Sequence, residues 1–130
     1  MDIFPPAKQR PAMLALVSAL DCQEKDLRRD ECGDWRIRGS QGHIYADVDG
    51  YLIIVETETP RQWSATKDRL AFAQLRNDRD WEGSFFLDRL PTPAEGPQIR
   101  RALMLRKRVR YSEEYAQTLR ERLGKRAVAA

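Results

Sequence analysis

The apolar residues near the start of the chain recur at helical spacing. They fill one face between Met13 and Leu20, and Pro11 stands where a first helical residue benefits from a fixed φ. This pattern predicts a helix from Pro11. The charged stretch 23–31 either continues that helix or forms a second helical turn, and Gly33 ends it. Residues 1–10 precede the periodic pattern, and we expect them to form an extended N-terminal arm.

The pattern then changes to the alternation of a half-buried strand. Trp35 and Ile37 alternate with two arginines, residues 39–42 supply turn chemistry, and Asp49-Gly50 separates two β-rich runs. An Asp-Gly pair in this setting favours a two-residue type I′ turn. The sequence therefore predicts a meander of about three strands over residues 35–57.

The Asp49-Gly50 turn also predicts a register for its hairpin. Ile44 would pair with Val55 and Ala46 with Ile53 on the core face, because residues directly opposite each other point to the same side. On the other face, His43 would lie across from Glu56.

Two capping signatures predict further helices. Thr59-Pro60-Arg61-Gln62 combines an N-cap hydroxyl, a proline and a glutamine, and it opens a helix that residues 77–78 should end. Thr92-Pro93-Ala94-Glu95 repeats the signature, Ser112 caps a last helix, and Ser84–Leu87 is predicted as a short fourth strand. The fold class is thus α+β, with a mainly antiparallel meander sheet of three to four strands packed with about four helices.

Length and hydropathy predict one domain that spans residues 1–130, with a flexible tail at residues 124–130. The longest uncharged apolar stretch, residues 12–20, has about half the length that a membrane span needs. We therefore expect a cytoplasmic protein without membrane contact. The oligomeric state cannot be predicted from the sequence.

The charges are distributed unevenly along the chain. The net charge is +3, but residues 91–130 hold 10 basic against 4 acidic residues, whereas residues 1–50 hold 7 against 9. Six cations within eleven positions could bind the phosphates of a nucleic acid or a nucleoprotein. These candidate nucleic-acid-binding residues are Arg100, Arg101, Arg106, Lys107, Arg108 and Arg110.

Two alternatives to nucleic-acid binding stay open at this point. The basic residues could form a solvated surface that nearby glutamates partly neutralise. The protein could instead be an adaptor or inhibitor that docks on a larger protein. Its anchors would then be Arg79 and Trp81, because arginine and tryptophan are enriched at interface hot spots.

A metal-dependent nuclease is a remote alternative. Asp47 or Asp49 with Glu56 and Glu58 would supply the carboxylates, but the predicted register separates Asp49 from Glu56 by roughly 20 Å. Such a distance argues against a shared ion.

Other catalytic chemistry has little support in the sequence. Cys22, Cys32 and His43 make a poor zinc set, and the glycines fit turns rather than a phosphate-binding loop. A His43–Glu56 pair would lack a nucleophile. We expect a non-enzymatic binding protein without metal or cofactor.

Several segments resemble a family of small bacterial proteins that has no assigned function. The resemblance rests on the segments 27–35, 42–46 and 90–92, and it extends to residues 63–72 and 82–93. It covers most of the chain. It implies no activity, cofactor or partner, and no functional residue is carried over from it.

Overall fold

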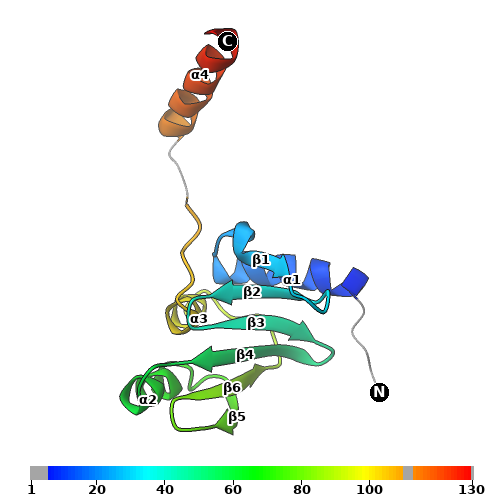
Figure 1. The fold of residues 1–130 in the computed structure, drawn as a ribbon, viewed down its shortest axis with the longest axis vertical. Coiled ribbons are helices and arrows are strands. Elements are labelled where there is room, and N and C mark those ends of the chain that lie inside the picture. The colour runs from blue at the N-terminus through cyan, green and yellow to red at the C-terminus, as the bar shows by residue number, and fades with distance from the viewer. Residues whose placement is uncertain (1–5, 110–112, 130) are drawn as a thin grey trace.

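The centre of the fold is an antiparallel sheet of six strands (Figure 1). The computed structural model describes residues 6–109 and 113–129. The strands are β1 (Leu27–Arg29), β2 (Trp35–Gly39), β3 (Gly42–Asp47), β4 (Gly50–Glu56), β5 (Gln74–Asp78) and β6 (Glu82–Leu87). The helices are α1 (Pro6–Leu20), α2 (Pro60–Arg69), α3 (Gly96–Leu103) and α4 (Glu113–Ala129), with a 3-10 turn η1 (Glu24–Asp26) before β1.

The strand order β1-β2-β3-β4-β6-β5 confirms the predicted α+β class but corrects the number of strands. The predicted meander is β2, β3 and β4, and the predicted fourth strand is β6. The other two strands, β1 and β5, lie at the edges of the sheet. The sequence pattern predicts a helical turn where β1 lies and a continuation of α2 where β5 lies, so the prediction of three to four strands is wrong.

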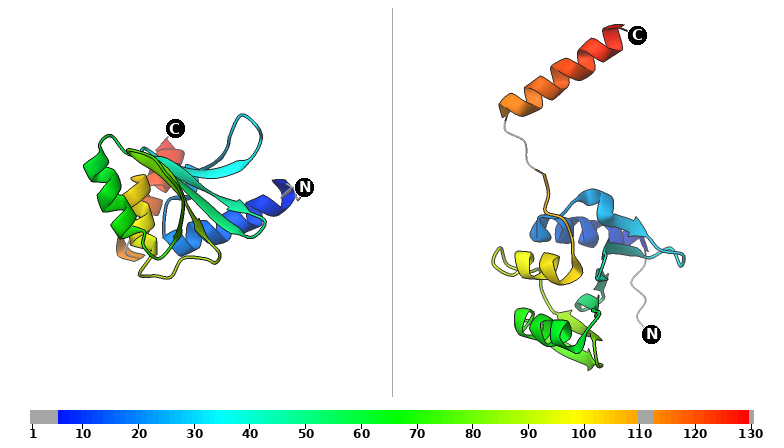
Figure 2. Two further views of the ribbon diagram at one scale, coloured as in Figure 1. Left: turned by 90° about the horizontal axis from the view of Figure 1, so that it is seen from below. Right: turned by 60° about the vertical axis from the view of Figure 1, so that its left-hand side comes forward.

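The hydrophobic core lies between the sheet and the helices α1, α2 and α3, which all cover the same face (Figure 2). One row of directly opposed residues runs across this inner face on all six strands. Its members are Leu27, Ile37, Ile44, Ile53, Phe85 and Leu75. The first five are buried, and Leu75 on the edge strand is partly exposed. At the two edges, β1 and β5 form despite a weak local strand propensity, because pairing with β2 and β6 adds Leu27 and Leu75 to the sheet face that the helices cover.

The β3–β4 hairpin has a register two residues away from the predicted one. Its loop is Val48-Asp49, and Ile44 pairs with Ile53 instead of Val55. Neither loop residue has a positive φ, so the predicted type I′ turn is wrong. A shift by two preserves which side chains face the core, because side chains alternate with period two.

Gly50 is required for a reason other than the turn. A Cβ at this position would lie 2.4 Å from the carbonyl oxygen of Leu87 on β6. The absence of a side chain at Gly50 therefore lets β6 approach β4. This close approach explains the glycine, and a type I′ turn at Asp49-Gly50 does not.

The helices also differ from the predictions at their ends. α1 begins at Pro6, so residues 6–10 of the predicted extended arm are helical, whereas residues 1–5 of that arm lie outside the described residues; Pro11 lies inside the helix. A proline at the first helical position loses no hydrogen bond, which allows this earlier start. Residues 124–129 belong to α4, residue 130 lies outside the described residues, and the flexibility predicted for this tail stays a prediction. None of the helices in the described ranges is long and apolar enough to cross a membrane.

Both predicted capping signatures form hydrogen bonds. Thr59 accepts a bond from the backbone N–H of Gln62 at the start of α2. Thr92 and Glu95 bond each other reciprocally, but one turn before α3 begins at Gly96. α2 ends at Arg69, well before residues 77–78, because the chain turns at residues 70–73 to enter β5.

A candidate anion-binding cleft

The basic segment after α3 is held in an extended conformation beside the end of α1. Cys22 and Lys107 form an isolated β-bridge, and the backbone N–H of Arg108 donates to the carbonyl oxygen of Asp21 at 2.7 Å. The side-chain amide of Gln23 donates to the carbonyl of Lys107. These contacts fix residues 106–108 against the body of the protein.

Arg100, the first of the predicted nucleic-acid-binding residues, has a structural role. Its guanidinium donates to the carbonyl oxygens of Leu20 and Asp21 at 3.2 Å each, and the Asp21 carboxylate lies 3.8 Å away. The side chain is 14% exposed. Arg100 therefore caps the C-terminal end of α1, where the last helical carbonyls need a donor, and binding of a ligand by Arg100 stays a prediction.

The other cations of the predicted set have different positions. Arg101, Arg106, Lys107 and Arg108 are exposed, and none pairs with an acidic side chain in the described part of the chain. Arg110 lies outside the described residues. Arg106 and Lys107 line two different hollows, so the set does not form one surface by itself.

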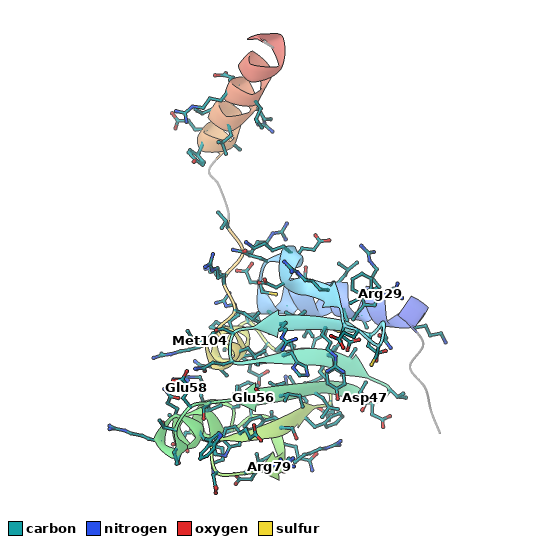
Figure 3. The ribbon with its side chains drawn as sticks, in the orientation of Figure 1. Arg29, Asp47, Glu56, Glu58, Arg79 and Met104 are labelled. Atoms are coloured by element: carbon teal, nitrogen blue, oxygen red, sulfur yellow. The ribbon has the colours of Figure 1, made fainter. Side chains whose placement is uncertain are left out.

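Arg106 lines a cleft of about 330 Å³ that three chain segments build together. The first segment is η1 and β1, the second is the end of β2 with its turn, and the third follows α3. Figure 3 shows Met104, at the start of the third segment, beside the end of β2. The lining residues are Lys25, Asp26, Arg28, Arg38, Gly39, Ser40, Met104 and Arg106.

Strand pairing positions the basic side chains of this cleft. Arg28 lies opposite Arg36 in the β1–β2 ladder, so Arg28 and Arg38 project from the same face of the sheet. The Arg28 side chain donates to the carbonyl of Lys25 at 3.0 Å, which ties β1 to η1.

The third segment reaches the cleft through a close backbone contact. A Cβ on Gly39 would lie 1.9 Å from the carbonyl oxygen of Leu103, so only glycine lets the end of α3 approach β2 this closely. Met104 then adopts a left-handed conformation with φ 58°, which ends the helix and directs the chain to Arg106.

The charges in the cleft are unbalanced. Four basic side chains, Lys25, Arg28, Arg38 and Arg106, face one carboxylate, that of Asp26. No ion pair forms between these four cations and any acid in the described ranges. Clustered unpaired cations create a positive potential that attracts anions. The arrangement can bind an anionic group through charge and guanidinium hydrogen bonds.

The second hollow is larger but less suited to an anion. It measures about 380 Å³ and lies between the end of α1 and the residues before α3. Among its lining residues the cations are Arg100 and Lys107, and Arg100 already caps α1.

The lone histidine belongs to a neighbouring cluster on the same face as Arg38. His43 lies across from Ile54, not Glu56, so the predicted His43–Glu56 pair is wrong; Glu56 lies across from Glu82. The two-residue shift of the hairpin is the cause. Arg36 contacts the imidazole Nε2 at 2.6 Å instead.

The environment of His43 favours its neutral form. Burial lowers the pKa of the imidazole, and the charges of Arg36 and Arg38 lower it further. Because the guanidinium of Arg36 can only donate, Nε2 accepts and Nδ1 carries the proton.

The carboxylates of the nuclease alternative lie far apart in the fold. Asp47 stands at the turn end of the β3–β4 hairpin and Glu56 at the opposite end of β4 (Figure 3). Within the described ranges, no three His, Cys, Asp or Glu side chains come close enough to hold a metal ion. Both cysteines are free, and burial raises the pKa of the Cys22 thiol to about 11, which makes this thiol a poor nucleophile.

The predicted protein anchors lie at the far edge of the sheet, in the connection between β5 and β6. Trp81 is 49% exposed, and its carbonyl oxygen accepts bonds from the backbone and hydroxyl of Thr57. Arg79 pairs with Glu82 at 3.6 Å. A protein interface at these two residues stays a prediction.

The sequence analysis missed three of the four cations in the cleft. Lys25, Arg28 and Arg38 come from a part of the chain with a net negative charge, so counting charges along the sequence did not select them. A partial signal existed in the alternation of Arg38 with the buried Ile37, which predicted an outward arginine. The other two cations, Lys25 and Arg28, are brought to the cleft by η1 and β1, and the sequence did not predict β1.

Compared with known proteins, the chain matches no protein-family model, no curated protein and no solved structure.

Proposed function

We propose that this protein binds nucleic acid through the cleft of Lys25, Arg28, Arg38 and Arg106. The observation that supports this proposal is the convergence of four unpaired cations from three chain segments around one carboxylate. The mutual repulsion of these cations destabilises the folded protein, and a bound anionic ligand would neutralise it.

A polyanion fits the surface better than a single small anion. The cleft is open, its four basic side chains are exposed, and Arg106 is followed directly by the exposed Lys107 and Arg108. A row of cations along an extended segment matches the repeated charges of a phosphate backbone. Alternate side chains of an extended segment point to the same side, so the nucleic acid would run from the cleft past Arg106 and Arg108, whereas Lys107 lines the other hollow.

The first test replaces two arginines of the cleft from different segments. We expect Arg38→Gln with Arg106→Gln to weaken binding to nucleic acid by about tenfold or more at low salt, because two phosphate contacts are lost. The slope of log affinity against log salt should also become less steep, by about 0.7 to 0.9 for each lost contact. Fluorescence anisotropy with a labelled oligonucleotide at several salt concentrations measures both quantities.

Arg61→Gln is the matched control. Arg61 is an exposed arginine on α2, on the helix-covered side of the sheet, and it forms no ion pair with a described residue. It removes one positive charge without touching the cleft, so its effect is compared with that of Arg38→Gln or Arg106→Gln alone as well as with the double variant. Equal effects of the control and the double variant, or no effect of either, would contradict the proposal.

A further inference from the structure

The face of the sheet that α1, α2 and α3 leave uncovered has an unusual composition. An open face of an antiparallel sheet is normally polar. Here two rows of directly opposed residues contain aromatic and aliphatic side chains. The first row contains Tyr45, Leu52 and Phe86, and the second contains His43 and Ile54 between the polar residues Arg38 and Ser84. Phe86 is 9% exposed, with the guanidinium of Arg76 over its ring at 4.0 Å, and the others are half-buried.

Three planar groups gather at one end of this face. The rings of His43 and Tyr45 are stacked with 5.9 Å between centroids and an angle of 22°. The guanidinium of Arg36 lies over Tyr45, 4.5 Å from its centroid. We call His43, Tyr45 and Arg36 the planar cluster.

The planar cluster is held rigidly. Arg36 donates to Asp30 at 2.5 Å and contacts His43 at 2.6 Å. The backbone N–H of Asp34 and the side chain of Arg36 hold the pKa of Asp30 below its ordinary value, so this carboxylate keeps its charge near Arg36. A guanidinium held between a carboxylate and an imidazole is already ordered, so a ligand that contacts it has little further ordering cost.

The planar cluster adjoins the cleft. Arg38, which lines the cleft, lies directly opposite His43 in the β2–β3 ladder. Opposed residues have Cβ atoms about 5 Å apart, so the basic and planar surfaces are continuous. A ligand that reaches both must therefore combine an anionic chain with flat, weakly polar groups.

We propose that the nucleic acid is single-stranded, with its phosphates in the cleft and its bases stacked on the planar cluster of Arg36, His43 and Tyr45. This inference rests on the proposed function. In a duplex the faces of the bases are hidden in the stack, whereas a single strand offers them to aromatic rings and guanidinium planes. An acidic peptide would satisfy the cations but has no planar groups for the cluster.

The experiment compares three probes of about ten units: a single strand of about 10 nucleotides, the duplex that it forms with its complement, and a polyglutamate peptide. Because the duplex carries about twice the charge of the single strand, charge alone would favour the duplex. We expect the single strand to bind at least about tenfold more tightly than the other two. Tyr45→Leu keeps apolar volume but removes the plane, and it should lower single-strand affinity about fivefold or more. The salt dependence should not change, since no cation is lost. Tyr45→Phe keeps the ring and should bind like the unaltered protein.

Trp81→Leu is the matched control, because Trp81 is an exposed aromatic residue in the β5–β6 connection, at the other edge of the sheet from the cleft. Equal affinity for the single strand and the duplex, with no effect of Tyr45→Leu, would overturn the single-strand inference. If Arg38→Gln with Arg106→Gln still weakened binding in that case, the proposed function would survive. Preference for polyglutamate over both oligonucleotides would overturn both proposals in favour of an acidic protein partner.

Discussion

Arg100 and Arg101 show that neighbouring arginines of one basic run have unrelated roles. Arg100 donates to two carbonyls at the end of α1, whereas Arg101 is exposed and unpaired with any described acid. A sequence count weights both equally. Their roles differ because α1 lies beside α3, and no local sequence pattern predicts that contact between the two helices.

We expect Arg100→Met to lower the free energy of unfolding by about 2 kcal/mol, because two carbonyl oxygens lose a charged donor. Arg101→Met should change it by less than about 0.5 kcal/mol, as is typical of exposed positions. Urea unfolding followed by circular dichroism measures both variants. A similar cost for the two would show that the cap contributes nothing to stability.

His43 predicts a pH dependence of stability. Its pKa is lower in the folded chain than its ordinary value of about 6.5, so below this pH the unfolded chain binds a proton that the folded chain resists. Stability should therefore be constant above about pH 6.5 and fall as the pH drops toward the folded-state pKa. Urea midpoints between pH 7.5 and 5.5 measure this decrease.

His43→Gln is the control for this pH effect. Glutamine retains an acceptor for Arg36 but does not titrate, and His43 is the lone histidine of the chain. The decrease in stability should be smaller in this variant. An identical pH profile would assign the effect to other groups.

At the scale of elements, the sequence predicted those with a strong local signal. β2, β3, β4 and α2 followed from alternation, turn residues and the Thr59 cap, and each is present. β1 has three residues and β5 is a polar edge strand, so neither carries a periodic pattern. They form because their backbones pair with β2 and β6, an interaction between distant residues.

The site was only partly predictable for the same reason. Arg106 was found because it stands in a basic run, but its partners in the cleft depend on the β1–β2 ladder. The hairpin register also depended on a distant contact, that of Gly50 with β6. Charge density along the sequence identified a region, and only pairing across the sheet showed which cations share a surface.

The close contact of Gly39 with the end of α3 gives a prediction about how β2 and the segment after α3 are held together at the cleft. Gly39→Ala would place a Cβ 1.9 Å from the backbone oxygen of Leu103, so β2 or α3 must move. We expect a loss of stability of about 2 kcal/mol or more, together with weaker nucleic-acid binding as Arg38 and Arg106 separate. Thermal unfolding and anisotropy measure the two effects.

Gly124→Ala is a control for which we expect no loss of stability. Gly124 lies inside α4 with open space around it, so alanine there should leave stability unchanged or raise it by up to about 1 kcal/mol. If Gly39→Ala were equally harmless, the close approach of α3 to β2 would not be a requirement of the fold.

For the whole molecule, the distribution of charge in space differs from that along the chain. Residues 91–130 carry most of the excess positive charge, yet three of the four cations in the cleft belong to residues 1–50. Arg100 is used in the interior contacts of α1 and α3. Arginines of the folded protein thus either make internal contacts, as Arg100 does, or line the exposed cleft where a ligand is proposed to bind.

The cleft exists only while η1, the end of β2 and the segment after α3 are held together. Without a ligand, its four like charges repel one another and work against the contacts that assemble the three segments. An anion that neutralises these charges replaces the repulsion with attraction, so it stabilises the assembled segments. Ligand binding and folding are then thermodynamically linked, so the melting temperature of the protein becomes a reporter of how much of the cleft is occupied.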